Sequence, residues 1–360
     1  MENESHRQTG YELQSVAGIP FFPMNLDHLS PELDFALKFA RQAADVAFQV
    51  ERDMVLSTLT KDDRSPVTTA DFAIQALAGR LIHEAFPGDI LVAEESAAMI
   101  KDGKAPASLE EITKVLARIW PETTADKIFE WVDRGTGVPG DRFWTLDPID
   151  GTKGFIRGDQ YATALALVVK GEVQLGVLTC PRLAIERGKA TVVRGNEGSV
   201  LIACRGQGAW SAPLKNGTAF AALAVSSAHD PSEAVVVRSY EDSHTNTDQL
   251  DRLVEALGIQ SAPVRMDSQA KYAVVAAGAA DLLLRFRSSN RQYDAAKIWD
   301  HAAGALIVQE AGGCVTDLHG KPLDFSAGRT LARNEGLLAS NRHLHGAALA
   351  GLRAIAEDRG

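Results

Sequence analysis

Two aspartates lie three positions apart in the segment Asp147-Pro148-Ile149-Asp150-Gly151-Thr152. A short predicted strand at residues 144–146 leads into them, and Gly151 allows a tight turn directly afterwards. Carboxylate and backbone carbonyl oxygens are the ligands that a hard cation such as Mg²⁺ prefers. Without a cation, close carboxylates raise the pKa of at least one of their number. The segment alone is equally consistent with an ordinary acidic surface turn, because short motifs often match by chance.

Three further acidic segments favour a metal site. Asp71 is expected at the start of a helix, Glu94 and Glu95 end a buried apolar strand, and Asp300 lies near the start of an apolar helix. A charge beside an apolar run needs a partner. Each position also has an ordinary interpretation: Asp71 as an N-cap, Glu95 as a surface acid, and Asp300 as an acid that complements a helix dipole. The four segments together predict one shared cation site.

The first two-thirds of the chain must position most of these residues. The apolar spacing predicts a long helix from Ser30 and a second helix at 70–86. Strands are expected at 90–93, 144–146, 161–169, 173–178, 191–194 and 199–203, with a helix at 109–119. Lys170-Gly171 suits a hairpin turn between two of these strands. Helices followed by antiparallel strands indicate an α+β layered arrangement.

A polar stretch at residues 211–218 is the expected domain boundary. Beyond it we expect strands at 234–238, 263–266, 282–286 and 314–316, alternating with helices at 247–256, 269–279 and 297–311. The predicted fold is therefore a layered α+β and α/β sandwich. It has a partly disordered extension at 1–29, a metal-binding lobe with an antiparallel sheet at 30–215, and a smaller α/β lobe at 216–360 that contributes Asp300.

Composition limits the classes of function. The 360 residues include 37 basic and 47 acidic side chains, and the net charge of −10 does not favour non-specific binding to nucleic acid. Cys180, Cys204 and Cys314 lack the spacing of a disulfide framework or a zinc site. No apolar run reaches the length of a membrane span, and the first residues do not resemble a secretory signal. We expect a cytoplasmic monomer that binds neither nucleic acid nor membrane.

Four motifs resemble, in the expected order, those of the lithium-sensitive inositol monophosphatase superfamily. They are SPVTTAD at 65–71, AEES at 93–96, WTLDPIDGTKGF at 144–155 and WDHAAGALIVQEAGG at 299–313. The resemblance covers roughly residues 32–345. It implies the sugar-phosphatase fold and a phosphomonoesterase that uses Mg²⁺, with two to three ions per site, and is inhibited by Li⁺.

The resemblance also implies a ligand set for each of three Mg²⁺ ions. The sets are Glu94, Asp147 and the carbonyl of Ile149 for the first, Asp147, Asp150 and Asp300 for the second, and Asp71 and Glu94 for a weaker third. Shared carboxylates hold such ions about 3.5–4 Å apart, the arrangement used for phosphoryl transfer.

The same resemblance assigns the reaction to a water molecule. Asp71 and Thr152 would orient and deprotonate this water, whose pKa a bound ion lowers. Backbone N–H groups around Gly151 and Thr152 would cradle the phosphate. No covalent enzyme intermediate is needed.

The histidine in WDHAAG resembles the 3′(2′),5′-bisphosphate nucleotidases within this superfamily, as do MDSQAKY at 266–272 and LLLRF at 282–286. The implied substrate is adenosine 3′,5′-bisphosphate, cleaved to AMP and phosphate, with the 5′-phosphosulfate analogue as a further candidate. By this resemblance Ser268 lies beside the adenosine, Lys271 and Arg285 bind the 5′-phosphate, and His244 contacts the nucleotide near the base. Arginine suits a bidentate phosphate contact.

The residues themselves leave alternatives open. Ser268 could be only a helix cap, Lys271 a solvated charge, Arg285 the partner of a neighbouring aspartate, and His244 a polar loop residue. The same metal residues would serve an inositol polyphosphate 1-phosphatase or an inositol monophosphatase. An inactive protein that senses nucleotides or cations is an alternative of another class. Residues 103–142 could form a lid or a surface elaboration.

Overall fold

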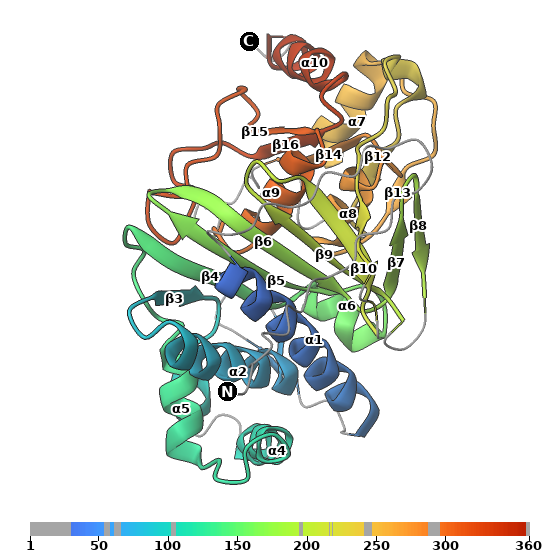
Figure 1. Ribbon diagram of the computed structural model, residues 1–360. Coiled ribbons are helices and arrows are strands. Elements are labelled where there is room, and N and C mark those ends of the chain that lie inside the picture. Colours follow the sequence, from blue (N-terminus) through green and yellow to red (C-terminus); the bar gives the residue numbers. More distant parts are fainter. Residues whose placement is uncertain are drawn as a thin grey trace, which may run out of the picture.

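The computed structural model describes residues 30–53, 58–60, 66–101, 106–193, 197–215, 217, 219–240, 247–286 and 296–357. The expected extension at residues 1–29 lies outside these ranges. Layers of helices alternate with two sheets (Figure 1). None of the described helices is long and apolar enough to cross a membrane.

The larger sheet has seven strands in the order β11-β10-β9-β6-β5-β4-β3. Their bounds are β3 (Ile90–Ala93), β4 (Arg142–Asp150), β5 (Ala162–Val169), β6 (Glu172–Cys180), β9 (Ser199–Cys204), β10 (Ala209–Pro213) and β11 (Ala221–Ala222). Every neighbouring pair is antiparallel except β3 and β4, which are parallel. The predicted turn is confirmed: Lys170 and Gly171 have φ angles of 51° and 78°, as the tight hairpin between β5 and β6 requires.

Two long helices cover one face of this sheet. α1 (Ser30–Asp53) packs on β5, β6 and β9, and α2 (Thr69–Ala85) packs on β4. Small residues on α1, such as Ala36 and Ala43, are fully buried and let the helix approach the strands closely. Behind α2 lie α4 (Pro106–Ala117) and α5 (Ala125–Asp133), which follow the short α3 (Ala98–Lys101). The described part of the 103–142 segment therefore adds to the helical layer.

The smaller sheet has the order β13-β12-β14-β16-β15. Its strands are β12 (Val236–Arg238), β13 (Val264–Arg265), β14 (Leu282–Arg285), β15 (Cys314–Thr316) and β16 (Leu337–Ser340). The pairs β13·β12 and β12·β14 are parallel, whereas β14·β16 and β16·β15 are antiparallel. α7 (Thr247–Ala256) and α10 (His345–Glu357) cover its outer face. The predicted layered α+β and α/β class is confirmed.

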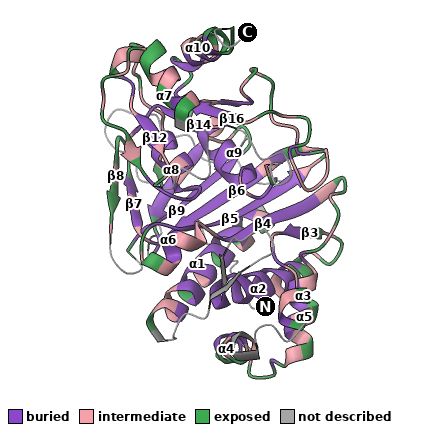
Figure 2. Ribbon diagram, turned by 180° about the vertical axis from the view of Figure 1, so that it is seen from behind, coloured by how far each residue is buried: buried purple, intermediate pink, exposed green. Residues whose placement is uncertain are grey.

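Two helices between the sheets join the halves of the molecule. α9 (Ala302–Glu310) packs on β5, β6 and β9 of the larger sheet and on β15 and β16 of the smaller one, with α8 (Ala270–Ala276) beside it. Figure 2 shows that buried residues dominate the central strands and α9. The larger sheet also takes β11 from beyond residue 215. The two halves therefore share one apolar core.

The remaining elements are short. β1 (Thr58–Thr60) pairs with β2 (Pro66–Thr68), and β7 (Leu183–Glu186) pairs with β8 (Lys189–Val192). α6 (Thr152–Arg157) follows β4, and a 3₁₀ turn, η1 (Pro231–Glu233), precedes β12.

Two predicted boundaries near the acidic segments were wrong. β4 continues through Asp150 instead of ending at Leu146. α9 begins at Ala302 rather than at Lys297, because Lys297 pairs with Thr330 in an isolated bridge and holds the chain out of the helix. Asp300 therefore lies in the turn before the helix. The elements that were not predicted from the sequence include α5, β10, β16 and α10.

A glycine sets the separation of the two central helices. A Cβ atom at Gly304 of α9 would lie 2.3 Å from Cδ2 of the Tyr272 ring on α8. By contrast, a Cβ atom at Gly346 of α10 would meet nothing within 4 Å.

We predict that Gly304→Ala lowers the free energy of unfolding by about 1–3 kcal/mol, because the new methyl group must displace a buried ring. The matched control, Gly346→Ala, should raise that free energy by up to about 1 kcal/mol through helix propensity. Urea unfolding of both variants measures the difference. Equal effects in the two variants would show that the α8–α9 contact is not as tight as described.

Candidate active site

A bulge in β4 brings Asp147 and Asp150 into one cluster. Asp147 pairs with Ala164 and Asp150 with Ala162, so β4 contains one extra residue in this stretch. Side chains three positions apart on a regular strand point to opposite faces, and a bulge redirects one of them. A proline is tolerated here because the ladder is already interrupted. The strand therefore places both carboxylates on the same side.

A left-handed glycine follows the second aspartate. Gly151 has φ 86°, and a Cβ atom there would lie 2.9 Å from Cβ of Ser268 in the other half of the molecule. α6 begins at the next residue, where the Thr152 hydroxyl donates to the carbonyl of Ile149 at 3.1 Å. Glycine thus allows the turn and the close approach of the two halves.

Glu94 lies just beyond β3, in backbone that is held by a buried glutamine. The amide nitrogen of Gln75 donates to the carbonyls of Glu95 (2.6 Å) and Val132 (2.8 Å), and its oxygen accepts from the Glu95 N–H (2.8 Å). Gln75 is fully buried, Glu95 is buried, and Glu94 is half-buried. The surface interpretation of Glu95 was therefore wrong, and Glu94 emerges from a rigid frame.

Asp71 is held by the helix that it begins. It occupies the third position of α2, and its Oδ2 accepts from the N–H and the hydroxyl of Thr68, each at 2.7 Å. Thr68, not Asp71, is the N-cap, so the ordinary interpretation placed the cap three residues too late. The capping box fixes the orientation of this carboxylate.

The charges of the four acidic segments act on one carboxylate, that of Asp147. Burial raises the pKa of Asp147 well above its usual value, and the charges of Glu94, Asp150, Asp300 and Asp71 raise it further. The Asp147 side chain is almost fully buried, and its Oδ1 has no hydrogen-bond partner among the described residues. Asp147 is therefore the centre of the acidic cluster.

The other two aspartates are partly compensated by groups from the second half. Burial and the charge of Asp300 raise the pKa of Asp150 to about 7, against the opposing effect of Lys271. Oδ2 of Asp150 also accepts from the Gln269 N–H at 2.6 Å. Burial raises the pKa of Asp300, opposed by Arg285, whose Nη1 donates to Asp300 Oδ2 at 3.0 Å.

The donor set of the cluster fits a hard divalent cation. No three His, Cys, Asp or Glu side chains in the described ranges are close enough to hold a metal ion as they stand. Asp71, Asp150 and Asp300 are turned towards protein donors instead. The donors are all oxygen, however, and a buried oxygen of Asp147 has no partner. A cation would offset both the burial and the mutual repulsion that raise these pKa values.

A strained turn from the second half closes over the cluster. Ser268 has φ 65°, a costly conformation for a residue with a side chain. Its neighbour Asp267 accepts from Arg157 Nη2 at 2.5 Å and from the Tyr240 N–H at 3.3 Å. Ser268 Oγ accepts from the N–H of Ala270, the first residue of α8, at 3.2 Å, whereas Gln269 occupies the N-cap position of that helix.

Gln269 ties this turn to the WDHAAG segment that begins at Trp299. Besides its contact with Asp150, its side-chain amide donates to the carbonyl of Trp299 at 2.9 Å. The residue is almost fully buried. No role was assigned to Gln269 from the sequence, although it stands inside the MDSQAKY motif.

Two expected phosphate-binding cations lie beside the acidic cluster. Lys271 Nζ donates to Ser239 Oγ at 2.8 Å, and burial lowers the pKa of this lysine. Arg285 contacts Asp300, which is the ion pair that the sequence left open as an alternative. Both cations act on the charge of Asp150. His244, the fourth expected nucleotide contact, lies outside the described residues.

His301 was not assigned a contact from the sequence. It is 3% exposed, and its Nδ1 and Nε2 lie 2.7 Å from Tyr272 Oη and 3.3 Å from Arg285 Nη1. Burial, together with Arg285 and Lys271, holds the pKa of this histidine well below its usual value. These surroundings therefore favour the neutral form of the ring.

Arg329 is a third residue to which no role was assigned from the sequence. Its guanidinium donates to the carbonyls of Gly135 (3.2 Å), Gly137 (2.9 Å) and Ala93, the residue before Glu94. The guanidinium carbon also lies 4.8 Å from the centroid of the Trp299 ring, next to Asp300. Arg329 thus joins two acidic segments. No local motif marks it, because its acceptors are backbone carbonyls some 190–240 positions away.

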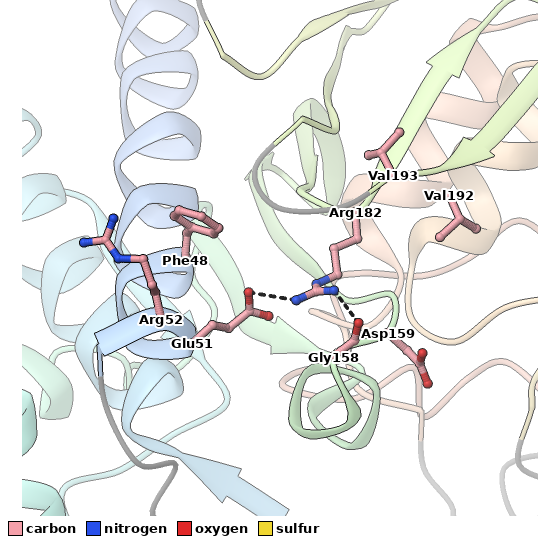
Figure 3. A pocket seen from close by; sticks show the side chains of 8 residues that line it. All are labelled: Phe48, Glu51, Arg52, Gly158, Asp159, Arg182, Val192 and Val193. Atoms are coloured by element: carbon pink, nitrogen blue, oxygen red, sulfur yellow. Dashed lines mark hydrogen bonds and ion pairs between the residues drawn. The ribbon is translucent and has the colours of Figure 1, made fainter.

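A cavity of about 540 Å³ lies at the other end of α6 (Figure 3). Phe48, Glu51 and Arg52 line it from α1, and Arg182 lies opposite, donating to Glu51 and to the carbonyl of Gly158. None of the clustered aspartates lines this cavity. It is separate from the acidic cluster.

Comparison with known proteins agrees with this geometry. The profile of the inositol monophosphatase family matches residues 28–357. A curated relative from Emericella nidulans, a 3′(2′),5′-bisphosphate nucleotidase, is 39% identical over 85% of this chain and 93% of its own. A relative of the same name from Oryza sativa is 39% identical over 92% of this chain and 94% of its own.

The fold has solved counterparts. The inositol monophosphatase of Thermotoga maritima superposes with a TM-score of 0.62 at 24% identity, covering 91% of this chain and 99% of that one. The chain therefore belongs to the inositol monophosphatase family, within which its curated relatives are 3′(2′),5′-bisphosphate nucleotidases, enzymes of the hydrolase class.

Proposed function

We propose that this protein is a Mg²⁺-dependent phosphomonoesterase that hydrolyses the 3′-phosphate of adenosine 3′,5′-bisphosphate to AMP and phosphate. The observation that carries the proposal is the juxtaposition of opposite charges at one site. A buried cluster of carboxylates centred on Asp147 lies against Lys271 and Arg285 from the other half of the molecule. The shared name of the curated relatives supports the substrate class.

The acidic residues are the candidate metal ligands. Glu94, Asp147 and the carbonyl of Ile149 would hold one Mg²⁺, and Asp150 and Asp300 would join Asp147 around a second. Asp71, with Glu94, would help to hold a third. When bound, the ions supply a more acidic water and compensate the charge of the phosphate ester.

The chain itself supplies orientation and proton transfer. Asp71 would accept the proton of the attacking water, and its capping box already fixes the carboxylate, as a general base requires. Thr152 would orient the same water through a hydroxyl that also contacts the carbonyl of Ile149. Backbone N–H groups at Gly151 and Thr152 would bind the phosphate that is cleaved.

The second half of the molecule would select the substrate. Lys271 and Arg285 would bind the 5′-phosphate, with the fork of the arginine suited to two phosphate oxygens. Ser268 would lie beside the adenosine, and His244 would contact the nucleotide near the base. A substrate with a second anionic group explains why two cations, Lys271 and Arg285, lie beside the carboxylate cluster. The 5′-phosphosulfate analogue would fit the same cations.

The test is Mg²⁺-dependent phosphate release from adenosine 3′,5′-bisphosphate, beside inositol 1,4-bisphosphate and inositol 1-phosphate. We expect a preference for the nucleotide, inhibition by Li⁺, and no turnover without Mg²⁺. Asp147→Asn and Asp300→Asn should each lower kcat by about 100-fold or more, because each removes charge from the ligand set. The exposed control Asp126→Asn should not.

A preference for either inositol phosphate would retain the metal chemistry and overturn the substrate. Near-normal turnover in Asp147→Asn or Asp300→Asn would overturn the ligand assignment.

A second prediction concerns pH. The pKa of Asp150 is raised to about 7 in the folded protein, so between its unfolded value and pH 7 the folded state binds more protons than the unfolded state. Without metal, this residue should therefore make stability fall as pH rises from 5 to 8.

Mg²⁺ should restore stability most at pH 8, because the ionised carboxylate is then the ligand. Thermal unfolding at pH 5 and 8, with and without Mg²⁺, measures this for the wild type and for Asp150→Asn, in which the titration is absent. We expect the variant to show a shallower loss of stability with pH and a smaller Mg²⁺ effect. Identical stability profiles for the wild type and Asp150→Asn would show that Asp150 does not carry the pH-dependent charge of the cluster.

A third prediction concerns Arg329. Lysine cannot donate in a planar fork to three carbonyls and stack on Trp299. We predict that Arg329→Lys costs about 1–3 kcal/mol of stability and raises the Mg²⁺ concentration needed for half-maximal activity severalfold. Arg333→Lys, at an exposed ion pair with Asp324, is the matched control. An unchanged Mg²⁺ requirement in Arg329→Lys would show that the contacts of Arg329 do not position the metal-binding carboxylates.

A further inference from the structure

The histidine after Asp300 contacts two other elements of the fold. His301 Nδ1 lies 2.7 Å from the hydroxyl of Tyr272 on α8, and Nε2 lies 3.3 Å from Nη1 of Arg285 at the end of β14. The same Nη1 donates to Asp300 Oδ2 at 3.0 Å. The ring therefore stands between a buried tyrosine and the arginine beside the acidic cluster.

The hydrogen-bond partners of His301 determine which ring nitrogen carries the hydrogen. A guanidinium group can only donate hydrogen bonds, so Nε2 of His301 must be the acceptor. The ring hydrogen is then on Nδ1 and is donated to the Tyr272 hydroxyl. In this tautomer His301 offers a lone pair to Arg285.

Asp300 and His301 both accept from Nη1 of Arg285. Among the described residues, Nη1 makes both of these contacts, and Nη2 and Nε make no hydrogen bond. The Arg285 side chain is 40% exposed. One edge of the guanidinium is thus fixed by Asp300 and His301, which leaves the other edge for the paired oxygens of a phosphate.

We propose that His301 is a positioning residue for the second phosphate of the substrate: its Nε2 aims Arg285, while Tyr272 holds the ring through Nδ1. This inference rests on the proposed function, since it assigns Arg285 to the phosphate that is not cleaved. It also gives a physical reason for a histidine directly after Asp300 in the WDHAAG segment. Aspartate alone would leave the guanidinium free to rotate about a single contact.

The alternative is that His301 is only a hydrogen-bonded residue of the core. A structural role would affect every substrate alike. A positioning role would affect substrates that carry a second phosphate more than those that lack it.

The experiment compares adenosine 3′,5′-bisphosphate with adenosine 3′-monophosphate, which lacks the 5′-phosphate. In His301→Leu we expect the ratio of kcat/KM between the bisphosphate and the monophosphate to fall about 10-fold, mainly through KM, because a poorly aimed arginine binds the extra phosphate less well. His301→Gln, which keeps an acceptor near Nε2, should recover part of the ratio. Tyr272→Phe should lower the ratio less than His301→Leu.

The control removes another buried histidine of the same half. His345 contacts Ser340 Oγ at 2.7 Å and Thr316 Oγ1 at 3.0 Å, away from Arg285. His345→Leu should lose stability without changing the ratio. Equal losses on both substrates in His301→Leu, or an unchanged ratio, would overturn the proposal.

Calorimetric titration with AMP and with adenosine separates this inference from the proposed function. AMP carries the 5′-phosphate, so we expect His301→Leu to weaken AMP binding about 10-fold and leave adenosine binding unchanged. If the wild type turns over no nucleotide but AMP binding shows this pattern, the reaction is wrong and the positioning role stands. If the wild type is active and His301→Leu binds AMP normally, the positioning role is wrong; a wild type that neither cleaves nor binds nucleotides overturns both.

Discussion

Repulsion among buried carboxylates is the constraint on which the rest of this structure depends. Asp147 is nearly inaccessible to water and faces the charges of four other acids, so its ionised form is strongly disfavoured in the free protein. Such a site persists only because rigid elements hold its members in place. The bulge in β4, the capping box of α2 and the Gln75 contacts each fix one acidic segment. A bound cation would relieve the unfavourable electrostatic free energy of this arrangement.

The same constraint explains why the two halves of the chain are not independent. Acids from the first half are balanced by Lys271 and Arg285 from the second, and Gln269 donates a backbone N–H across the junction. Arg329 returns from the second half to hold the end of β3. With α9 packed between the sheets, the charged site and the apolar core join the halves at the same place. A substrate with one phosphate to lose and one to keep would use both halves.

Much of this could be predicted from the sequence. Each acidic segment adjoins a locally recognisable element, so Asp71, Glu94 and the residues of β4 could be linked from the sequence alone. The roles of Gln269, His301 and Arg329 could not, because their partners are backbone carbonyls or side chains distant in sequence, and no spacing rule reports such contacts. The start of α9 was missed for a similar reason: the bridge between Lys297 and Thr330 overrides helical periodicity. The contact of His244, the sensitivity to Li⁺ and the monomeric state stay predictions.

The most direct test of the account is anomalous diffraction from crystals grown with Mn²⁺, an ion of the same oxygen-ligand class as Mg²⁺. We predict anomalous peaks bounded by Asp147 together with Glu94 on one side and Asp150 and Asp300 on the other. A cluster that stays empty while Mn²⁺ binds elsewhere in the crystal would contradict the assignment of these carboxylates as metal ligands.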